Sequence, residues 1–203
     1  MTSSTIIEEV EAMRKSGLAL LAFYYYDFRD DQQNNLRGLL SSVLFQLCDQ
    51  SESYHDIVST FYSTHSHGAQ CPSDNELALC LKELLKLPGQ APVYLIIDAL
   101  DECLNTPALA SPREKVLSLV EDLIDSRLAN LHIGVTSRPE LDIKVSLQPL
   151  SFYSVSIHDE IGQLEDIENY IQSVVKTNRK MQRWTAEHKQ LVIDALTNRA
   201  DGM

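Results

Sequence analysis

Residues 93–102, VYLIIDALDE, form the stretch that most constrains the fold of this chain. Its apolar part does not alternate with polar residues, which is typical of a strand covered on both faces, as in a parallel sheet. Three acidic residues, Asp98, Asp101 and Glu102, follow where that strand ends. Ligands of open parallel sheets bind beyond the carboxyl ends of the strands. The stretch therefore predicts a buried parallel strand that leads into a candidate site.

Three other segments are predicted as strands, at residues 18–28, 131–137 and 151–157. The first, LALLAFYYYDF, is apolar and aromatic almost throughout, and the other two, LHIGVTS and SFYSVSI, are rich in β-branched and aromatic residues. Amphipathic segments separate the strands, and one of them carries an apolar stripe at Leu36, Leu39, Leu40, Val43, Leu44 and Leu47. This order predicts an α/β fold in which helices cover a parallel sheet on both faces.

Helical spacing of apolar residues predicts helices at 4–15, 36–48, 52–63, 73–85, 111–124, 163–176 and 185–200. Two of these begin with a capping box, formed by Ser73 with Glu76 and by Ser111 with Glu114. The predicted sheet ends at residue 157, and the chain is all-helical beyond it. We therefore expect an α/β domain over residues 1–157 and the start of a helical subdomain over 158–203.

Charge and apolar run length exclude several functions. The chain has 203 residues, with 17 Lys and Arg against 29 Asp and Glu, for a formal net charge of −12. Binding to nucleic acid or to an anionic membrane by charge attraction needs the opposite balance. The longest apolar run covers residues 18–26, whereas a membrane helix needs about 20 residues. We therefore predict neither nucleic acid nor membrane as a partner.

The cysteines and histidines do not form a recognisable metal or disulfide pattern. Cys48, Cys71, Cys80 and Cys103 lie far apart, without the close pairs that zinc sites use. The histidines are also scattered. The N-terminus carries acidic residues where a secretory signal peptide needs basic ones. These features favour a cytoplasmic protein with reduced cysteines.

Two segments at predicted strand ends carry candidate site residues. The negative charges of Asp98, Asp101 and Glu102 repel one another when they lie side by side. Mg²⁺ held by one carboxylate and by substrate phosphates would reduce this repulsion. A solvated acidic loop is the alternative. Ser137 and Arg138 follow the strand that begins at residue 131, and a hydroxyl and a guanidinium there suit contact with phosphate. An ordinary loop before Pro139 explains them as well.

Together these segments resemble a known pattern. An apolar strand ending in DALDE, followed by an apolar strand ending in TSRP at residues 136–139, resembles the Walker B and sensor 1 motifs of NACHT NTPases. The resemblance is closest to the fungal proteins of that group and to the related nephrocystin-like N-terminal NTPase domain. It implies a P-loop-type core that acts as a nucleotide-controlled signalling switch, with Mg²⁺ and ATP or GTP as cofactors.

The resemblance also assigns roles to the candidate residues. It implies that Asp98 binds Mg²⁺, that Asp101 and Glu102 lie near the attacking water, and that Arg138 senses the terminal phosphate. Ser137 is a neighbour of that arginine. The implied partners are other domains of a longer parent chain or further copies of the same chain.

One essential motif of that family is missing from the sequence. A P-loop reads GxxxxGK[ST], whereas no Gly-Lys pair occurs in the chain. Residues 3–10 are similar to the helix that follows the P-loop in the family, so we expect a fragment without the first strand and with inefficient NTP binding and hydrolysis. A non-catalytic interaction domain, or pseudo-NTPase, is the alternative. A serine hydrolase is disfavoured because no GxSxG motif occurs.

The missing strand affects the predicted sheet. In the family, the P-loop strand lies between the sensor 1 strand and the last strand, so its absence leaves an unpaired strand edge. We expect residues 151–157 to move sideways and pair with 131–137. The predicted parallel order is then 18–28, 93–98, 131–137 and 151–157.

Overall fold

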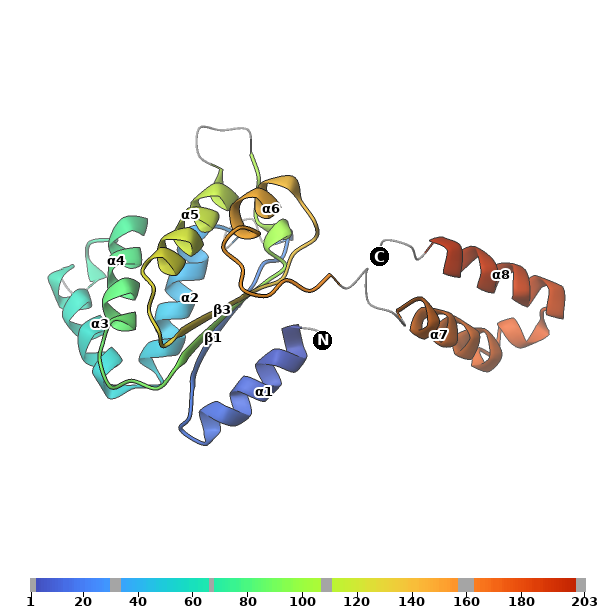
Figure 1. Ribbon diagram of the computed structural model, residues 1–203, viewed down its shortest axis with the longest axis horizontal. Coiled ribbons are helices and arrows are strands. Elements are labelled where there is room, and N and C mark those ends of the chain that lie inside the picture. The colour runs from blue at the N-terminus through green and yellow to red at the C-terminus, as the bar shows by residue number, and fades with distance from the viewer. Residues whose placement is uncertain (1–2, 30–33, 66–67, 107–110, 157–162, 200–203) are drawn as a thin grey trace. The chain divides into compact units, whose positions relative to one another are not determined.

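The computed structural model describes residues 3–29, 34–65, 68–106, 111–156 and 163–199. The chain divides into two compact units, Met1–Ser151 and Phe152–Met203. Figure 1 shows the first as strands and helices and the second as a helical pair. Within the described residues, every helix is too short or too polar to cross a membrane.

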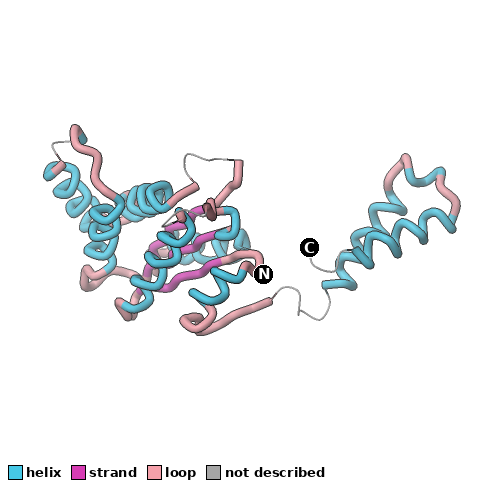
Figure 2. Tube along the Cα trace, turned by 90° about the horizontal axis from the view of Figure 1, so that it is seen from above, coloured by secondary structure: helices cyan, strands magenta, loops and turns pink. Residues whose placement is uncertain are grey.

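A three-stranded parallel sheet forms the centre of the first unit (Figure 2). Its strands are β1 (Leu20–Tyr25), β2 (Val93–Asp98) and β3 (Leu131–Val135), in the order β1-β2-β3. In the register of the sheet, Leu95 of β2 lies between Ala22 of β1 and Ile133 of β3. The predicted α/β class, with a parallel sheet flanked by helices, is confirmed.

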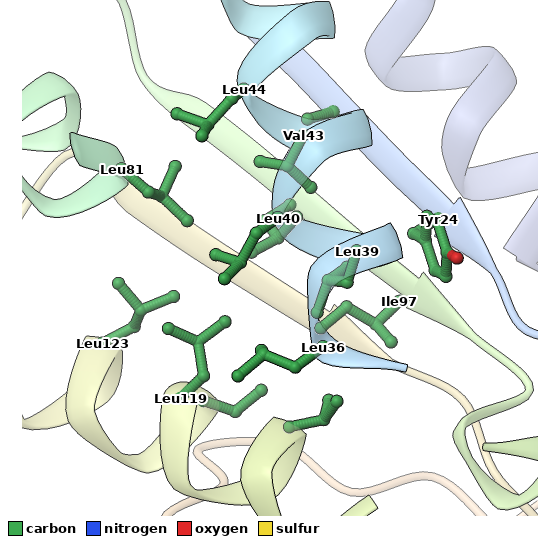
Figure 3. Close-up of a cluster of buried hydrophobic side chains, with 14 of the residues drawn as sticks. Tyr24, Leu36, Leu39, Leu40, Val43, Leu44, Leu81, Ile97, Leu119 and Leu123 are labelled. Atoms are coloured by element: carbon green, nitrogen blue, oxygen red, sulfur yellow. The ribbon is translucent and has the colours of Figure 1, made fainter. Parts of the chain in front are cut away.

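Four helices build the larger core of this unit. They are α2 (Leu36–Cys48), α3 (Glu52–Thr64), α4 (Asp74–Leu85) and α5 (Pro112–Asp125). The apolar stripe predicted on the first of them is buried along its whole length, at Leu36, Leu39, Leu40, Val43, Leu44 and Leu47. Figure 3 shows this stripe between the sheet and side chains of α4 and α5. Burial of apolar side chains at helical spacing therefore explains why the segment is a helix and how it is oriented.

The opposite face of the sheet is covered by α1 (Ser3–Lys15). Val10 of this helix packs with Leu21 of β1 and Ile96 of β2 in a second, smaller apolar cluster. Figure 1 shows α1 and α2 on opposite sides of the strands. Gly134 of β3 leaves room for Ile96, because a Cβ there would lie 3.0 Å from the Ile96 Cδ1 atom. Helices on both faces are thus confirmed for this unit.

Two segments after β3 differ from the sequence prediction. The predicted fourth strand at 151–157 is wrong for its described residues, because residues 151–156 form no strand and expose Phe152 and Tyr153. Residue 157 lies outside the described residues. A β-rich composition makes a strand only where a neighbour pairs with its backbone. The order of the first three strands is as predicted, while the pairing of 151–157 with 131–137 is not observed.

The second difference is a short helix that the sequence analysis missed. α6 (Leu141–Leu147) begins just after Pro139, and Ile143 is its buried residue. With only seven residues it offers two turns of periodicity, which is too little to separate a helix from a loop by pattern alone.

The second unit contains the two helices predicted at the C-terminal end. α7 (Gln163–Thr177) and α8 (Ala186–Arg199) pack on each other, and the short 3₁₀ helix η4 (Met181–Arg183) lies between them in the chain. Val175 and Ile193 are buried.

Candidate functional site

Asp98 ends β2, and Thr136 fixes its carboxylate from the neighbouring strand. The Thr136 hydroxyl donates a hydrogen bond to Asp98 Oδ1 and accepts one from the Ala99 N–H at 3.1 Å. Thr136 directly follows β3, and its own N–H donates to the carbonyl of Ile97 at 2.9 Å. The threonine therefore locks the carboxyl ends of β2 and β3 together around the first acidic residue.

The chain turns sharply after Asp98. Ala99 has φ 54° and ψ 46°, a left-handed conformation that is uncommon for a residue other than glycine. The turn leads into the 3₁₀ helix η2 (Leu100–Glu102), where Leu100 is completely buried. The buried leucine anchors the turn, and the two acidic residues that follow it are thereby held near the sheet.

Asp101 binds the second predicted site segment. Its Oδ1 accepts a hydrogen bond from the Arg138 N–H at 2.9 Å, and its Oδ2 lies 3.5 Å from Arg138 Nε. The Asp101 side chain is 9% exposed, whereas that of Arg138 is 77% exposed. The arginine is thus held at its backbone end, while its guanidinium lies at the surface.

Glu102 connects the acidic loop to the loop after β1. Its Oε2 accepts a hydrogen bond from the Phe28 N–H at 3.2 Å, and its carbonyl accepts one from Asn34 Nδ2 at 2.6 Å. At the same carboxyl end of the sheet, Arg29 donates hydrogen bonds to the Asp27 carboxylate. These bonds lower the pKa of Asp27 to about 2. The acidic loop is therefore braced from β1 as well as from β3.

Arg113 is a central residue of this site that the sequence analysis missed. Its guanidinium donates to the carbonyls of Asp101 and Cys103, the latter at 3.2 Å, and lies 3.2 Å from Asp142 Oδ2. The side chain is 8% exposed. A cation in the first turn of a helix is opposed by the helix dipole. An arginine at this position in the sequence therefore indicates that the side chain has a specific carboxylate or carbonyl partner.

The structure brings most of the predicted site residues together. Asp98, Asp101 and Glu102 lie in one loop, and Arg138 joins them through Asp101. Ser137 lies beside them in the chain, but its hydroxyl donates to the Arg138 carbonyl at 2.6 Å. Within the described residues, no three His, Cys, Asp or Glu side chains lie close enough to hold a metal ion between them.

The buried thiol next to the acidic loop gives a testable consequence. Burial raises the pKa of the Cys103 thiol to about 11, and burial also raises that of Cys80 to about 11. At pH 8 only about one Cys103 in a thousand is then the reactive thiolate. We expect iodoacetamide to modify the exposed Cys71 at least about tenfold faster than either buried cysteine, as measured by mass spectrometry. Rapid labelling of Cys103 in the folded chain would contradict its burial.

Comparison with known proteins identifies one family. The family model described as nephrocystin 3, N-terminal, matches residues 1–138. The matched region covers α1 to α5, all three strands, the acidic loop and Arg138. No curated protein matches the chain.

Proposed function

Since the chain belongs to the nephrocystin 3 N-terminal family, we propose that its α/β unit is a module of a nucleotide-controlled signalling switch. In this proposal the acidic loop and Arg138 form the end of the site that faces Mg²⁺ and the terminal phosphates of ATP or GTP. The geometry of Asp98 is the observation that carries the proposal.

Asp98 suits a metal contact made through a single carboxylate. Thr136 holds its Oδ1, while Oδ2 accepts no hydrogen bond within the described part of the chain. One free oxygen on a fixed carboxylate fits Mg²⁺, which binds proteins through one or two carboxylates and takes its other ligands from phosphates and water. The bound ion would neutralise phosphate charge.

In this proposal Asp101 would position Arg138, and Glu102 would position the water that attacks the terminal phosphate. Asp101 holds the Arg138 backbone and also lies 3.5 Å from its Nε, and the guanidinium is exposed enough to meet a phosphate as well. A guanidinium matches phosphate oxygens with two parallel hydrogen bonds. Glu102 uses one carboxylate oxygen for the Phe28 N–H, which leaves the other oxygen for a water molecule.

The proposal predicts weak nucleotide binding by this chain. The sequence has no Gly-Lys pair and therefore lacks the lysine that P-loop proteins use to hold phosphates. We expect a dissociation constant no tighter than roughly 1 mM for Mg·ATP or Mg·GTP. An NMR titration should shift the amide signals of residues 98–102 and 136–138, and only with Mg²⁺ present. Micromolar affinity, or shifts confined to other regions, would contradict it.

Two matched variants test the role of Asp98. Asp98→Asn keeps an oxygen that accepts from Thr136 but removes the charge, so we expect an unchanged or higher melting temperature and loss of the Mg²⁺-dependent shifts. Asp27→Asn removes a carboxylate at the end of β1 that Arg29 already occupies. It should leave the titration as in the wild type. A large loss of stability in Asp98→Asn would indicate a structural role instead.

A non-catalytic interaction domain is the second candidate function. It is favoured by the pairing of Arg138 with Asp101, because these charges already satisfy each other in part. The same titration distinguishes the two candidates. An interaction domain would show no Mg²⁺-dependent shift at residues 98–102, even at about 10 mM nucleotide.

A further inference from the structure

The backbone groups of β1 point alternately toward β2 and toward the outer edge of the sheet. In a parallel ladder the N–H and C=O groups of one residue point to the same side, and those of the next residue point to the other. The N–H of Tyr26, just after β1, donates to the Asp98 carbonyl at 3.1 Å. Even-numbered residues of β1 therefore bind β2, and the backbone groups of Leu21, Phe23 and Tyr25 face the outer edge.

Two glutamines, one in α2 and one just after it, bind the first two of these outward residues. Gln50 accepts from the Leu21 N–H at 2.9 Å and donates to the Leu21 carbonyl at 2.6 Å. Gln46 makes the same pair of bonds with Phe23, at 3.1 and 2.8 Å. The spacings match because four helical residues rise roughly 6.0 Å and two strand residues roughly 6.6 Å. Each side-chain amide thus replaces one residue of a neighbouring strand.

The same step along helix and strand places Ser42 opposite Tyr25. A serine side chain is two carbon atoms shorter than that of glutamine, and the Ser42 hydroxyl instead accepts a hydrogen bond from Gln46 Nε2 at 3.0 Å. Within the described ranges, the outward N–H and C=O groups of Tyr25 have no hydrogen-bond partner. The row of side-chain amides along β1 therefore stops one position short of the end of the strand.

A pocket of about 200 Å³ lies at this position. Phe23, Tyr25, Asn34 and Ser42 are among the residues that line it. The rings of Phe23 and Tyr25 meet edge to face, with centroids 5.5 Å apart, and Tyr25 is 47% exposed. Pockets for drug-sized ligands have roughly 300–1,000 Å³, so this one suits a ligand with a single ring.

Asn34 brings a further unused polar group to the pocket. The residue is 2% exposed, and its Nδ2 donates to the Glu102 carbonyl at 2.6 Å. Its Oδ1 is buried and accepts no hydrogen bond in the part of the chain that the structure describes. Buried polar atoms without a partner are uncommon in folded proteins. The pocket therefore combines one N–H and C=O pair with a second acceptor.

We propose that this pocket binds a small aromatic primary carboxamide. The ligand carbonyl accepts from the Tyr25 N–H and one amide hydrogen is donated to the Tyr25 carbonyl, as the Gln46 amide does at Phe23. The second amide hydrogen matches Asn34 Oδ1, and the ring packs against the aromatic side chains. A carboxylate has no N–H to donate, and it would bring a negative charge to Asp27, which also lines the pocket.

The neighbouring positions favour a single amide group over an added strand. Gln50 and Gln46 already occupy the outer edge of β1 at Leu21 and Phe23. A strand from another chain could pair there only with Tyr25, and one residue is too little to hold it. A carboxamide needs only that one residue.

Titration of the full chain with benzamide, followed by NMR, tests the proposal. We expect saturable shifts of the Tyr25 and Ser42 amide signals, with a dissociation constant of roughly 1–10 mM. Acetophenone has a methyl group in place of the amide nitrogen and should bind at least about tenfold more weakly, because it donates no hydrogen bond. Equal binding of the two compounds would overturn the proposal. So would benzamide that gives no saturable shift at these residues up to about 50 mM.

Two glutamine variants of α2 locate the site. Ser42→Gln supplies the third side-chain amide, so it should weaken benzamide binding and slow hydrogen exchange of the Tyr25 amide, each at least about tenfold. Ser41→Gln adds the same side chain at an exposed position outside the row that faces β1 and should leave the dissociation constant within about twofold. Glutamine favours a helix more than serine does, so both variants should fold.

Two results with these proteins would contradict the assigned site. One is benzamide binding to Ser42→Gln that is as tight as in the wild type. The other is a Tyr25 amide that, in the wild type without ligand, exchanges as slowly as that of Phe23, because its N–H would then already be bonded.

Discussion

Replacing Arg113 by methionine is expected to lower the free energy of unfolding by about 3 kcal/mol. The arginine side chain is 8% exposed and serves the Asp101 and Cys103 carbonyls together with the Asp142 carboxylate. Methionine fills much of the space but donates no hydrogen bond, so buried acceptors lose their partner. Urea denaturation of the two proteins, followed by circular dichroism, measures the difference.

Arg14→Met is the matched control for that variant. Arg14 forms an ion pair with Glu11 on α1, and its side chain is 37% exposed. Ion pairs at the surface contribute little because water and salt screen them. The control should therefore remain within about 1 kcal/mol of the wild type. If both variants lose the same free energy of unfolding, the buried contacts of Arg113 stabilise the fold no more than a surface ion pair does.

The Arg113 variant also reports on the acidic loop itself. The guanidinium holds the loop at Asp101 and Cys103, on either side of Glu102. Without it, the amide signals of residues 101–104 should move, while those of Ala99 and Thr136 should stay, because the Thr136 hydroxyl fixes that end separately. A uniform change over the whole sheet would instead indicate a general loss of packing.

The parts of the fold that the sequence predicted are those that depend on local pattern. The stretch at residues 93–98 is apolar without alternation, and it is the central strand with helices on both faces. The capping boxes at Ser73 and Ser111 form as predicted and begin α4 and α5. Each of these features is decided by residues within a few positions of one another, so a single sequence suffices to find them.

The parts that were missed depend on contacts between distant residues. Whether residues 151–156 pair as a strand depends on a neighbour rather than on their own composition, and they have none in the described structure. The grouping of the acidic residues followed from their spacing in the chain. Their bracing by Thr136 and Arg113 joins three separate segments, and no spacing rule connects those positions.

Leu40 of α2 provides the second large expected effect. It was predicted as part of the apolar stripe of that helix, and in the structure it is completely buried in the core between the sheet and the neighbouring helices (Figure 3). Leu40→Ala removes three carbon atoms from the buried side chain and leaves a cavity. We expect a loss of about 3 kcal/mol and a melting temperature lower by about 6–12 °C, measured by thermal and urea denaturation.

Phe45→Ala separates burial from helix propensity on the same helix. Phe45 lies on the opposite side of α2 from the stripe and is 76% exposed, so its truncation removes little packing. Alanine also favours the helix more than either residue that it replaces. The Phe45 variant should therefore be as stable as the wild type to within about 0.5 kcal/mol. Equal losses of stability at Leu40 and Phe45 would mean that α2 does not bury the predicted face against the sheet.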